Sequence, residues 1–424
     1  MANVPDKFTR NKILDNIASL FSGSLIAQGM TVLALLFTAR QVGATDYGRY
    51  AAAFALTGFT SILFNLGLDL WLLSQGGRQP GQLNQFISTV LLIKSLGGLP
   101  WFVIIAVSTI FLNQNTFPRN ILLLSAFTVW LDSLFATILT AFKTSLHNRI
   151  TSLLEAGSDI LWFLTTLVFI TLNTRNVVVF IEIRSLVLLL TLTAALLTVK
   201  RFFGFSFNLS VLRMALSESL PFAVSEFLSW TLLRSDVIII SLALGAFAAG
   251  VYSPAVGVVN GLFLVPSSVY MVMVPVLSNR YGNDPKQANI TAKRTILLLV
   301  VVGLLLTLGF TAGAPLLVSF LESSFSESLK IMQILSPILL LKSISFAMAT
   351  IIVATDNQGQ RTIVQAIATG TNIILNLIIV NYLGVYGVAA VYVFTELLIL
   401  VGYGWIVQRY RTHQHLAESP AADY

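Results

Sequence analysis

The stretch RQVGATDYGRYAAAF, residues 40–54, lies between two long apolar runs, and a related stretch, LGAFAAGVYSPAV, follows at residues 244–256. Glycine permits positive φ and close helix approach, and tyrosine suits a membrane interface. Each copy therefore predicts a tight turn just outside a membrane. At one fixed offset five residues match: Gly43 with Gly245, Ala44 with Ala246, Gly48 with Gly250, Tyr50 with Tyr252, and Ala53 with Ala255.

The composition around these turns is that of an integral membrane protein. Of the 424 residues, 56% are hydrophobic and 10% are charged, against roughly 25% charged in a soluble domain. Apolar runs of about 20 residues, long enough to cross ~30 Å of hydrocarbon, recur along the chain. The short alternating segments of a membrane β-barrel are absent from the sequence. We expect an all-α fold of twelve transmembrane helices at 17–39, 51–73, 87–112, 120–142, 151–172, 176–199, 216–243, 251–278, 295–320, 329–354, 361–380 and 384–407.

The basic residues predict the orientation of these spans. Sixteen of the 25 Lys and Arg residues fall in the N-terminus, the C-terminus and the even-to-odd loops, and five fall in the opposite loops. By the positive-inside rule, both termini are expected in the cytoplasm of a bacterial cell. The apolar run after the polar first sixteen residues is too long for a cleaved signal peptide, so the first helix is expected to stay in the protein.

The same inventory argues against several classes of function. The net charge of +7 is spread one to four residues at a time through the loops, which is a topology signal and not a nucleic-acid surface. There is no cysteine, the three histidines form no metal motif, and no phosphate-binding Gly-rich loop precedes a Lys. We expect no metal, no cofactor and no ATP hydrolysis within this chain.

The repeat predicts the domain organisation. Both copies join the first and second helix of a six-helix set, and an even number of spans separates them, so they have the same orientation in the membrane. We expect two pseudo-symmetric lobes, residues 1–200 and 201–424, around a central cavity. Two such lobes are the architecture of a transporter that opens alternately to either side.

With these motifs the chain resembles the polysaccharide-repeat (O-antigen type) flippases of the multidrug/oligosaccharidyl-lipid/polysaccharide exporter superfamily. The resemblance is carried by the segments ARQVGATDYGRYAAAFAL (39–56), SLPFAVSEFL (219–228), LLRSDVIIIS (232–241) and LGAFAAGVYSPA (244–255), together with the polar, basic N-terminus. It implies twelve helices around a cavity and a substrate that is an oligosaccharide on a polyprenyl pyrophosphate carrier. It also implies that the protein acts together with glycosyltransferases and a polymerase in lipopolysaccharide or exopolysaccharide synthesis.

Charged residues inside the predicted spans are the candidate site residues, because a charge near the bilayer centre costs about 2.5–3.5 kcal/mol. The span 216–243 holds Glu226, Arg234 and Asp236. Arg234 and Asp236 lie about 160° apart around the helix and cannot both face one stripe. Arg234 is a candidate for binding pyrophosphate, since a guanidinium matches phosphate oxygens, and we interpret Asp236 as structural. Glu226 is a candidate for proton or ion coupling.

Lys94 and Asp69 are expected at similar depth on adjacent helices, where they either pair structurally or leave Lys94 to contact a headgroup. Lys342 is a further candidate for substrate binding. Asp132 and Glu396 are candidates for proton or ion coupling, because no charge near them in the sequence neutralises them. We interpret Glu182 and Arg184 as a local structural pair. We interpret Glu155 and Asp159 as a solvated interfacial face.

Helix-breaking residues predict where the protein bends. The span 251–278 holds Pro254 and Pro266 with Gly257 and Gly261. Proline inside a helix frees a carbonyl and bends the axis. We expect a hinge here during transport, with a packing kink as the alternative.

Two rival functions follow from the same chain. A cation-coupled multidrug exporter of the same superfamily typically carries an acid within its first helix, and the span 17–39 has none. A membrane glycan polymerase or ligase needs a sizeable outer loop, and the longest outward connection is about ten residues. The sequence favours a non-enzymatic flippase over both.

Overall fold

The computed structural model describes residues 10–418; residues 1–9 and 419–424 lie outside the described residues. Side chains are described for residues 22–410 apart from 225 and 285. Every regular element in this described part is a helix, as the apolar runs predict. In lipid a helix satisfies its own backbone N–H and C=O groups, which explains this choice of element.

The chain divides into two compact units, one of residues 1–241 with 245–250 and the other of residues 242–244 with 251–424. The lobes expected at 1–200 and 201–424 stay a prediction. The helices that begin in unit 1 are α1 (Arg10–Thr60), α2 (Ile62–Asn65), α3 (Leu68–Arg78), η1 (Pro80–Gln82), α4 (Leu83–Ser108), α5 (Arg119–Thr144), α6 (Asn148–Thr171), α7 (Val177–Phe202), α8 (Leu209–Glu218), α9 (Leu220–Ala243) and α10 (Ala246–Leu262).

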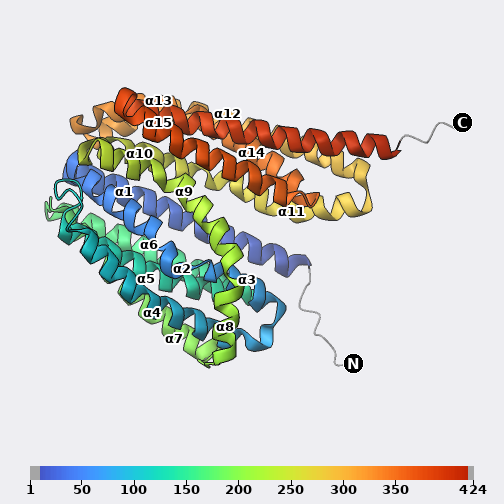
Figure 1. Cartoon of the computed structure of the whole chain (residues 1–424), viewed down its shortest axis with the longest axis horizontal. Coiled ribbons are helices and arrows are strands. Elements are labelled where there is room, and N and C mark those ends of the chain that lie inside the picture. Colours follow the sequence, from blue (N-terminus) through green and yellow to red (C-terminus); the bar gives the residue numbers. More distant parts are fainter. Residues whose placement is uncertain (1–9, 419–424) are drawn as a thin grey trace, which may run out of the picture. The chain divides into compact units, whose positions relative to one another are not determined.

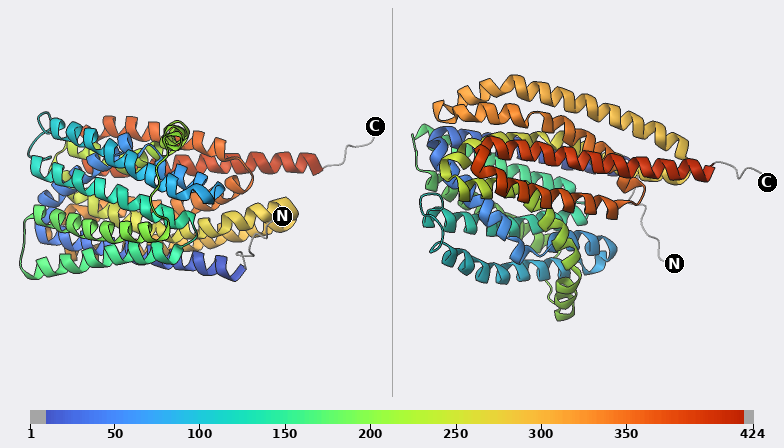
Figure 2. Two further views of the ribbon diagram at one scale, coloured as in Figure 1. Left: turned by 90° about the horizontal axis from the view of Figure 1, so that it is seen from below. Right: turned by 45° about the horizontal axis from the view of Figure 1, so that its top comes forward.

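Unit 2 contains the part of α10 after residue 250 and the remaining helices. These are α11 (Leu264–Asn283), α12 (Pro285–Leu321), η2 (Ser323–Phe325), α13 (Ser326–Leu335), α14 (Pro337–Ala354) and α15 (Gln358–Glu418). Within this unit α14 packs against α11, α12 and α15 (Figures 1 and 2). Its buried face, which includes Ile338, Leu339 and Ala347, forms part of the core.

Nine helical segments in the described residues are long and apolar enough to cross a membrane. Two of them, residues 22–65 and 358–410, have 44 and 53 residues, more than twice the length that one crossing needs. Each is interrupted by one glycine with non-helical backbone angles, Gly43 and Gly384. Helix α9 has 24 residues but carries three charges. These features agree with twelve crossings, and the count itself stays a prediction.

The two copies of the repeated motif turn the chain at matching glycines. Gly43 has φ 81° and Gly245 has φ 87°, the left-handed region that glycine enters without steric cost. At Gly43 the blue helix α1 reverses direction (Figure 1). The prediction that these glycines supply positive φ is confirmed, although the expected polar connection at 40–50 is almost entirely helical.

The second glycine of each copy brings the two copies into contact. A Cβ atom added to Gly48 would clash with the carbonyl oxygen of Ala246, and one added to Gly250 would clash with that of Ala44. The predicted close helix approach is therefore confirmed, and it joins the two copies to each other within unit 1. This is the small-residue packing that lets membrane helices approach closely.

The tyrosines of the motif do not lie where the sequence suggested. Tyr50 and Tyr252 are buried, not placed at an interface. Tyr50 stacks on Tyr47 with ring centres 5.7 Å apart and packs on Phe54 at 4.4 Å. Aromatic packing inside the protein thus outweighed the interfacial preference of a single tyrosine.

Four of the predicted continuous spans are broken. The span 216–243 is divided at Ser219 into α8 and α9, and the span 329–354 is divided at Ser336 into α13 and α14. The span 51–73 is interrupted at Ser61 and again at Leu66 and Gly67, which have φ of 48° and 68°. The span 251–278 is divided at Phe263 into α10 and α11. Pro266 explains the break at Phe263, because it has no N–H for the carbonyl of residue 262 and its ring crowds that carbonyl.

We predict that Gly48→Ala and Gly250→Ala each destabilise the protein by about 1–3 kcal/mol, because the added methyl group overpacks a contact between two backbones. Thermal unfolding in detergent measures the effect. Gly29→Ala is the matched control on α1, since a Cβ there meets nothing within 4 Å. Equal unfolding temperatures for the three variants would contradict the close contact.

Candidate functional site

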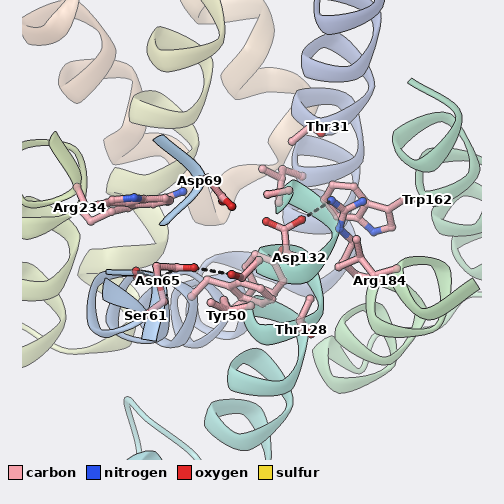
Figure 3. Close-up of a pocket in the computed structure, with 18 of the residues that line it drawn as sticks. Thr31, Tyr50, Ser61, Asn65, Asp69, Thr128, Asp132, Trp162, Arg184 and Arg234 are labelled. Carbon is pink, nitrogen blue, oxygen red and sulfur yellow. Dashed lines mark hydrogen bonds and ion pairs between the residues drawn. The ribbon is translucent and has the colours of Figure 1, made fainter. Parts of the chain in front are cut away.

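Unit 1 contains a cavity of about 320 Å³ lined by α1, α2, α3, α5, α6, α7 and α9. Its lining combines charges of both signs with aromatic and hydroxyl groups (Figure 3). A second cavity of about 240 Å³ shares Asp132, Ala136 and Arg184 with the first. The polar and aromatic residues of the larger cavity are Thr31, Tyr50, Phe54, Ser61, Asn65, Asp69, Thr128, Asp132, Ser133, Trp162, Arg184, Glu226, Trp230 and Arg234.

Several of these groups lie at the break between helices α2 and α3. Asn65 donates to the hydroxyl of Ser61 at 3.1 Å, and Ser133 of α5 donates to the Asn65 side-chain oxygen. Gly67 packs so closely on the backbone of Ala223, at the start of α9, that a Cβ would clash there. The sequence prediction missed this break, although a glycine inside an apolar span is the signal that marked it.

Lys94 and Asp69 form the ion pair that the sequence allowed. Lys94 Nζ lies 2.7 Å from Asp69 Oδ2 and donates to the carbonyl of Ser133 at 3.3 Å. The other Asp69 oxygen accepts from the Thr137 hydroxyl at 2.7 Å. The Lys94 side chain is 0% exposed, whereas that of Asp69 is 28% exposed and lines the cavity. Of the two roles left open for Lys94, the geometry favours the structural one.

Arg184 is the site residue that the sequence prediction assigned wrongly. Its predicted partner Glu182 is exposed, because residues two apart on a helix point to nearly opposite sides. Arg184 instead donates to Asp159 at 2.8 Å and lies 3.7 Å from Asp132. Its guanidinium also stacks over Trp162, 4.3 Å from the ring centre. Asp159 is therefore a partner of Arg184 and not part of a solvated face.

Helix α9 places Arg234 in the cavity and Asp236 outside it. Arg234 lines the cavity opposite Asp132 and Arg184 (Figure 3), and its guanidinium lies 5.6 Å from the Trp230 ring centre. Its Nε is buried without a hydrogen-bond partner. No carboxylate of the described residues lies within ion-pair distance of it. Asp236 is buried and is not a lining residue, as the 160° separation requires.

Two candidates that looked isolated in the sequence pair with each other in unit 2. Lys342 Nζ of α14 lies 2.8 Å from Glu396 Oε2 of α15. Glu396 is 1% exposed, and its other oxygen, Oε1, has no hydrogen-bond partner. Lys342 also lies 5.7 Å from the ring centre of Phe263, at the break between α10 and α11.

The remaining candidates occupy different surroundings. Glu226 lines the larger cavity from α9 beside Trp230. Asp132 lines both cavities, and its side chain is 58% exposed. The candidate hinge residues Pro254, Gly257 and Gly261 lie in α10 and Pro266 lies in α11, on either side of the break at Phe263. Among the described residues no His, Cys, Asp and Glu cluster suits a metal ion.

Comparison with solved structures identifies the fold. The fold matches an inward-facing transporter of the MATE multidrug resistance family in the MOP superfamily, with a TM-score of 0.75, 15% identity, and 93% of this chain and 96% of that chain covered. It also matches the lipid II flippase MurJ in an inward closed conformation, with a TM-score of 0.77, 16% identity, and coverage of 92% and 87%. This chain thus has the helical membrane fold that these two transporters share.

A third match is a MOP superfamily transporter from Pyrococcus furiosus, with a TM-score of 0.60, 14% identity, and coverage of 93% and 95%. At these identities the likeness establishes the fold and not the substrate. No curated protein matches the chain in sequence. The family model described as "Polysaccharide biosynthesis protein" matches residues 13–281, and the MatE model matches residues 221–378. The chain belongs to the polysaccharide biosynthesis protein family.

We predict that Asp69→Asn destabilises the protein by about 3–5 kcal/mol, because it leaves the fully buried Lys94 ammonium without an opposite charge. Lys94→Met is expected to cost less, since it leaves Asp69 at a cavity wall where water can reach it. The double variant is expected to recover part of the loss. Unfolding of the purified variants measures all three.

The pair Asp46 and Arg49 provides the control, because its side chains are 37% and 33% exposed. Asp46→Asn is expected to cost about 0–1 kcal/mol. An equal loss of unfolding free energy in Lys94→Met and Asp69→Asn would contradict this prediction, because it would show that the difference in burial between the two side chains does not affect stability.

Proposed function

We propose that the protein is a flippase that moves a polyprenyl-pyrophosphate-linked oligosaccharide repeat unit from the cytoplasmic to the periplasmic leaflet. The observation that carries the proposal is Arg234, a cavity-lining guanidinium with no carboxylate of the described residues within ion-pair distance. A charge inside a membrane span is costly, so an uncompensated one implies a visiting anion. A pyrophosphate provides that anion, because its oxygens match the donors of a guanidinium.

The rest of the cavity suits the head of such a substrate. A volume of about 320 Å³ lies in the range of small-molecule sites and fits a pyrophosphate with the first sugar. Trp162, Trp230 and Tyr50 offer flat apolar surfaces to sugar rings, while Asn65 and Thr128 offer hydrogen bonds to hydroxyl groups. The polyprenyl tail needs no protein site, because lipid solvates it.

Transport by alternating access requires the two lobes, 1–200 and 201–424, to close at one side while they open at the other. We propose the break between α10 and α11 as the hinge, with Pro254, Pro266, Gly257 and Gly261 around it. Lys342 contacts both Glu396 and the Phe263 ring at this break. It is thus placed to respond to a change in the helix angle.

We predict that Pro266→Ala slows transport while it leaves substrate binding unchanged, because an alanine N–H restores the missing backbone hydrogen bond and stiffens the hinge. Transport into the interior of proteoliposomes and binding in detergent measure the two quantities. Pro315→Ala is the control, since Pro315 lies inside the unbroken helix α12 of the same unit. If Pro266→Ala transports at the wild-type rate, the hinge proposal is contradicted and Pro266 only produces a kink that serves helix packing.

Asp132, Glu226 and Glu396 are the proposed groups for proton or ion coupling. Each carboxyl group lies in a helix of the transmembrane part, and the first two line the cavity. In a chain without an ATP-binding motif, an ion gradient or removal of the product downstream supplies the driving force.

The proposed setting is the cytoplasmic membrane of a bacterium, with both termini in the cytoplasm. Glycosyltransferases would supply the lipid-linked unit on the inner face, and a polymerase would consume it on the outer face. Lipopolysaccharide with its O-antigen and exopolysaccharide are the products that fit this scheme.

The alternative is a cation-coupled multidrug exporter, which the match of the MatE model to residues 221–378 supports. A cationic drug would bind near the carboxylates of Asp132 and Glu226 in the same cavity, and the positive charge of Arg234 would repel it. The two functions therefore predict opposite effects of removing the Arg234 charge.

We predict that Arg234→Gln lowers flipping of a polyprenyl-pyrophosphate-linked sugar in proteoliposomes by about 10- to 100-fold, the loss expected for one or two hydrogen bonds to a charged group. Arg234→Lys, which keeps the charge and loses the fork geometry, is expected to fall between Gln and wild type.

Arg175→Gln serves as the control, because it removes an exposed arginine outside the cavity. In cells, deletion of the gene is expected to remove a surface glycan and to accumulate its lipid-linked unit on the inner face. An unchanged glycan together with greater sensitivity to cationic dyes would favour the drug exporter.

A further inference from the structure

Arg184 is held rigidly on one side only. On that side Asp159 accepts from its Nη1 at 2.8 Å and Trp162 lies 4.3 Å from its carbon Cζ. Asp159 and Trp162 are three residues apart on α6, so they form one surface of that helix. Among the described residues, Asp159 is the one hydrogen-bond acceptor of this guanidinium.

The opposite edge of the guanidinium faces a different kind of partner. Nη2 lies 3.7 Å from Asp132 Oδ1, which is too long for a hydrogen bond and leaves only a Coulombic attraction. The Asp132 side chain is 58% exposed, against 14% for Asp159. Arg184 and Asp132 both line the larger cavity (Figure 3) and the smaller one beside it. The donors on this edge are therefore unsatisfied and accessible.

We propose that Arg184 is a second anion-binding residue of the cavity and that Asp132 is a placeholder carboxylate, which yields its position at Arg184 to the pyrophosphate of the substrate. This inference rests on the proposed function for the identity of the anion. It assigns Asp159 and Trp162 to positioning Arg184, and it places a second guanidinium across the cavity from Arg234.

Exchange at Arg184 is favourable because a phosphate oxygen can make the hydrogen bond that Asp132 does not make. Asp159 keeps the arginine neutralised and oriented while the exchange occurs, so no step leaves the guanidinium alone in the membrane. Asp132 is exposed to the cavity and can turn toward water as it leaves.

The test is the affinity of the purified full-length protein for inorganic pyrophosphate and for farnesyl pyrophosphate, measured by titration calorimetry in detergent. Asp132→Asn removes the competitor and is expected to tighten both ligands about 3- to 10-fold. Arg184→Gln is expected to weaken both about 10-fold or more, and Arg184→Lys to weaken them less, as expected for hydrogen bonds to charged groups. Glu182→Gln, an exposed acid on α7, is expected to change neither.

Opposite signs for Asp132→Asn and Arg184→Gln support the exchange. A purely structural ion pair predicts that both variants lose affinity and unfold at lower temperature, and that result overturns the proposal. Unmeasurable binding of both ligands by the wild-type protein overturns it as well. Because Asp132 is exposed and asparagine has its shape, the Asp132→Asn variant is expected to fold normally, which unfolding curves check.

The same experiment separates this inference from the proposed function. If the opposite signs are found while proteoliposomes move no lipid-linked sugar, the anion site stands and the flippase proposal falls. If lipid-linked sugar is moved while both variants bind like wild type, the flippase stands and the placeholder role falls.

Discussion

The cost of an ionised group in hydrocarbon is the constraint on which this structure depends. The chain retains charges inside its spans, and the fold pairs several of them: Lys94 with Asp69, Lys342 with Glu396, and Arg184 with Asp159. Each pair joins two different helices, so compensation also ties the bundle together. Among the described residues that line the larger cavity, Arg234 and Glu226 have no ion-pair partner, and the proposed function assigns an anionic substrate to Arg234.

Membership in the polysaccharide biosynthesis protein family and the likeness to both MurJ and MATE transporters define one fold with more than one kind of cargo. A shared fold at about 15% identity cannot choose between those cargoes, since function lies in the site that the fold carries. Here the site has both signs of charge. Of its carboxylates, Asp69 and Asp132 lie near Lys94 and Arg184, whereas Glu226, like Arg234, has no ion-pair partner among the described residues.

Backbone geometry and site chemistry are connected through the broken helices. Left-handed residues at Leu66 and Gly67 interrupt the second predicted span beside the cavity, where Asn65 and Asp69 line the wall. Irregular backbone at this depth is tolerated where it faces protein or a wet cavity and not lipid. In the repeated motif the first glycine turns the chain and the second packs one copy against the other, so one short sequence performs two distinct tasks in each half.

The class of fold, the positions of most helices, the repeat and the charges inside the spans could be predicted from local composition, because hydrocarbon thickness and the cost of a charge act on it directly. The sequence also separated Arg234 from Asp236, since helical geometry needs only their spacing. Only the tertiary structure decided the partners: Arg184 with Asp159 and Asp132, and Lys342 with Glu396, join residues 25 to 54 positions apart on different helices. It also decided the breaks at Leu66 and Phe263 and the burial of Tyr50. These depend on packing between helices, which no local pattern encodes.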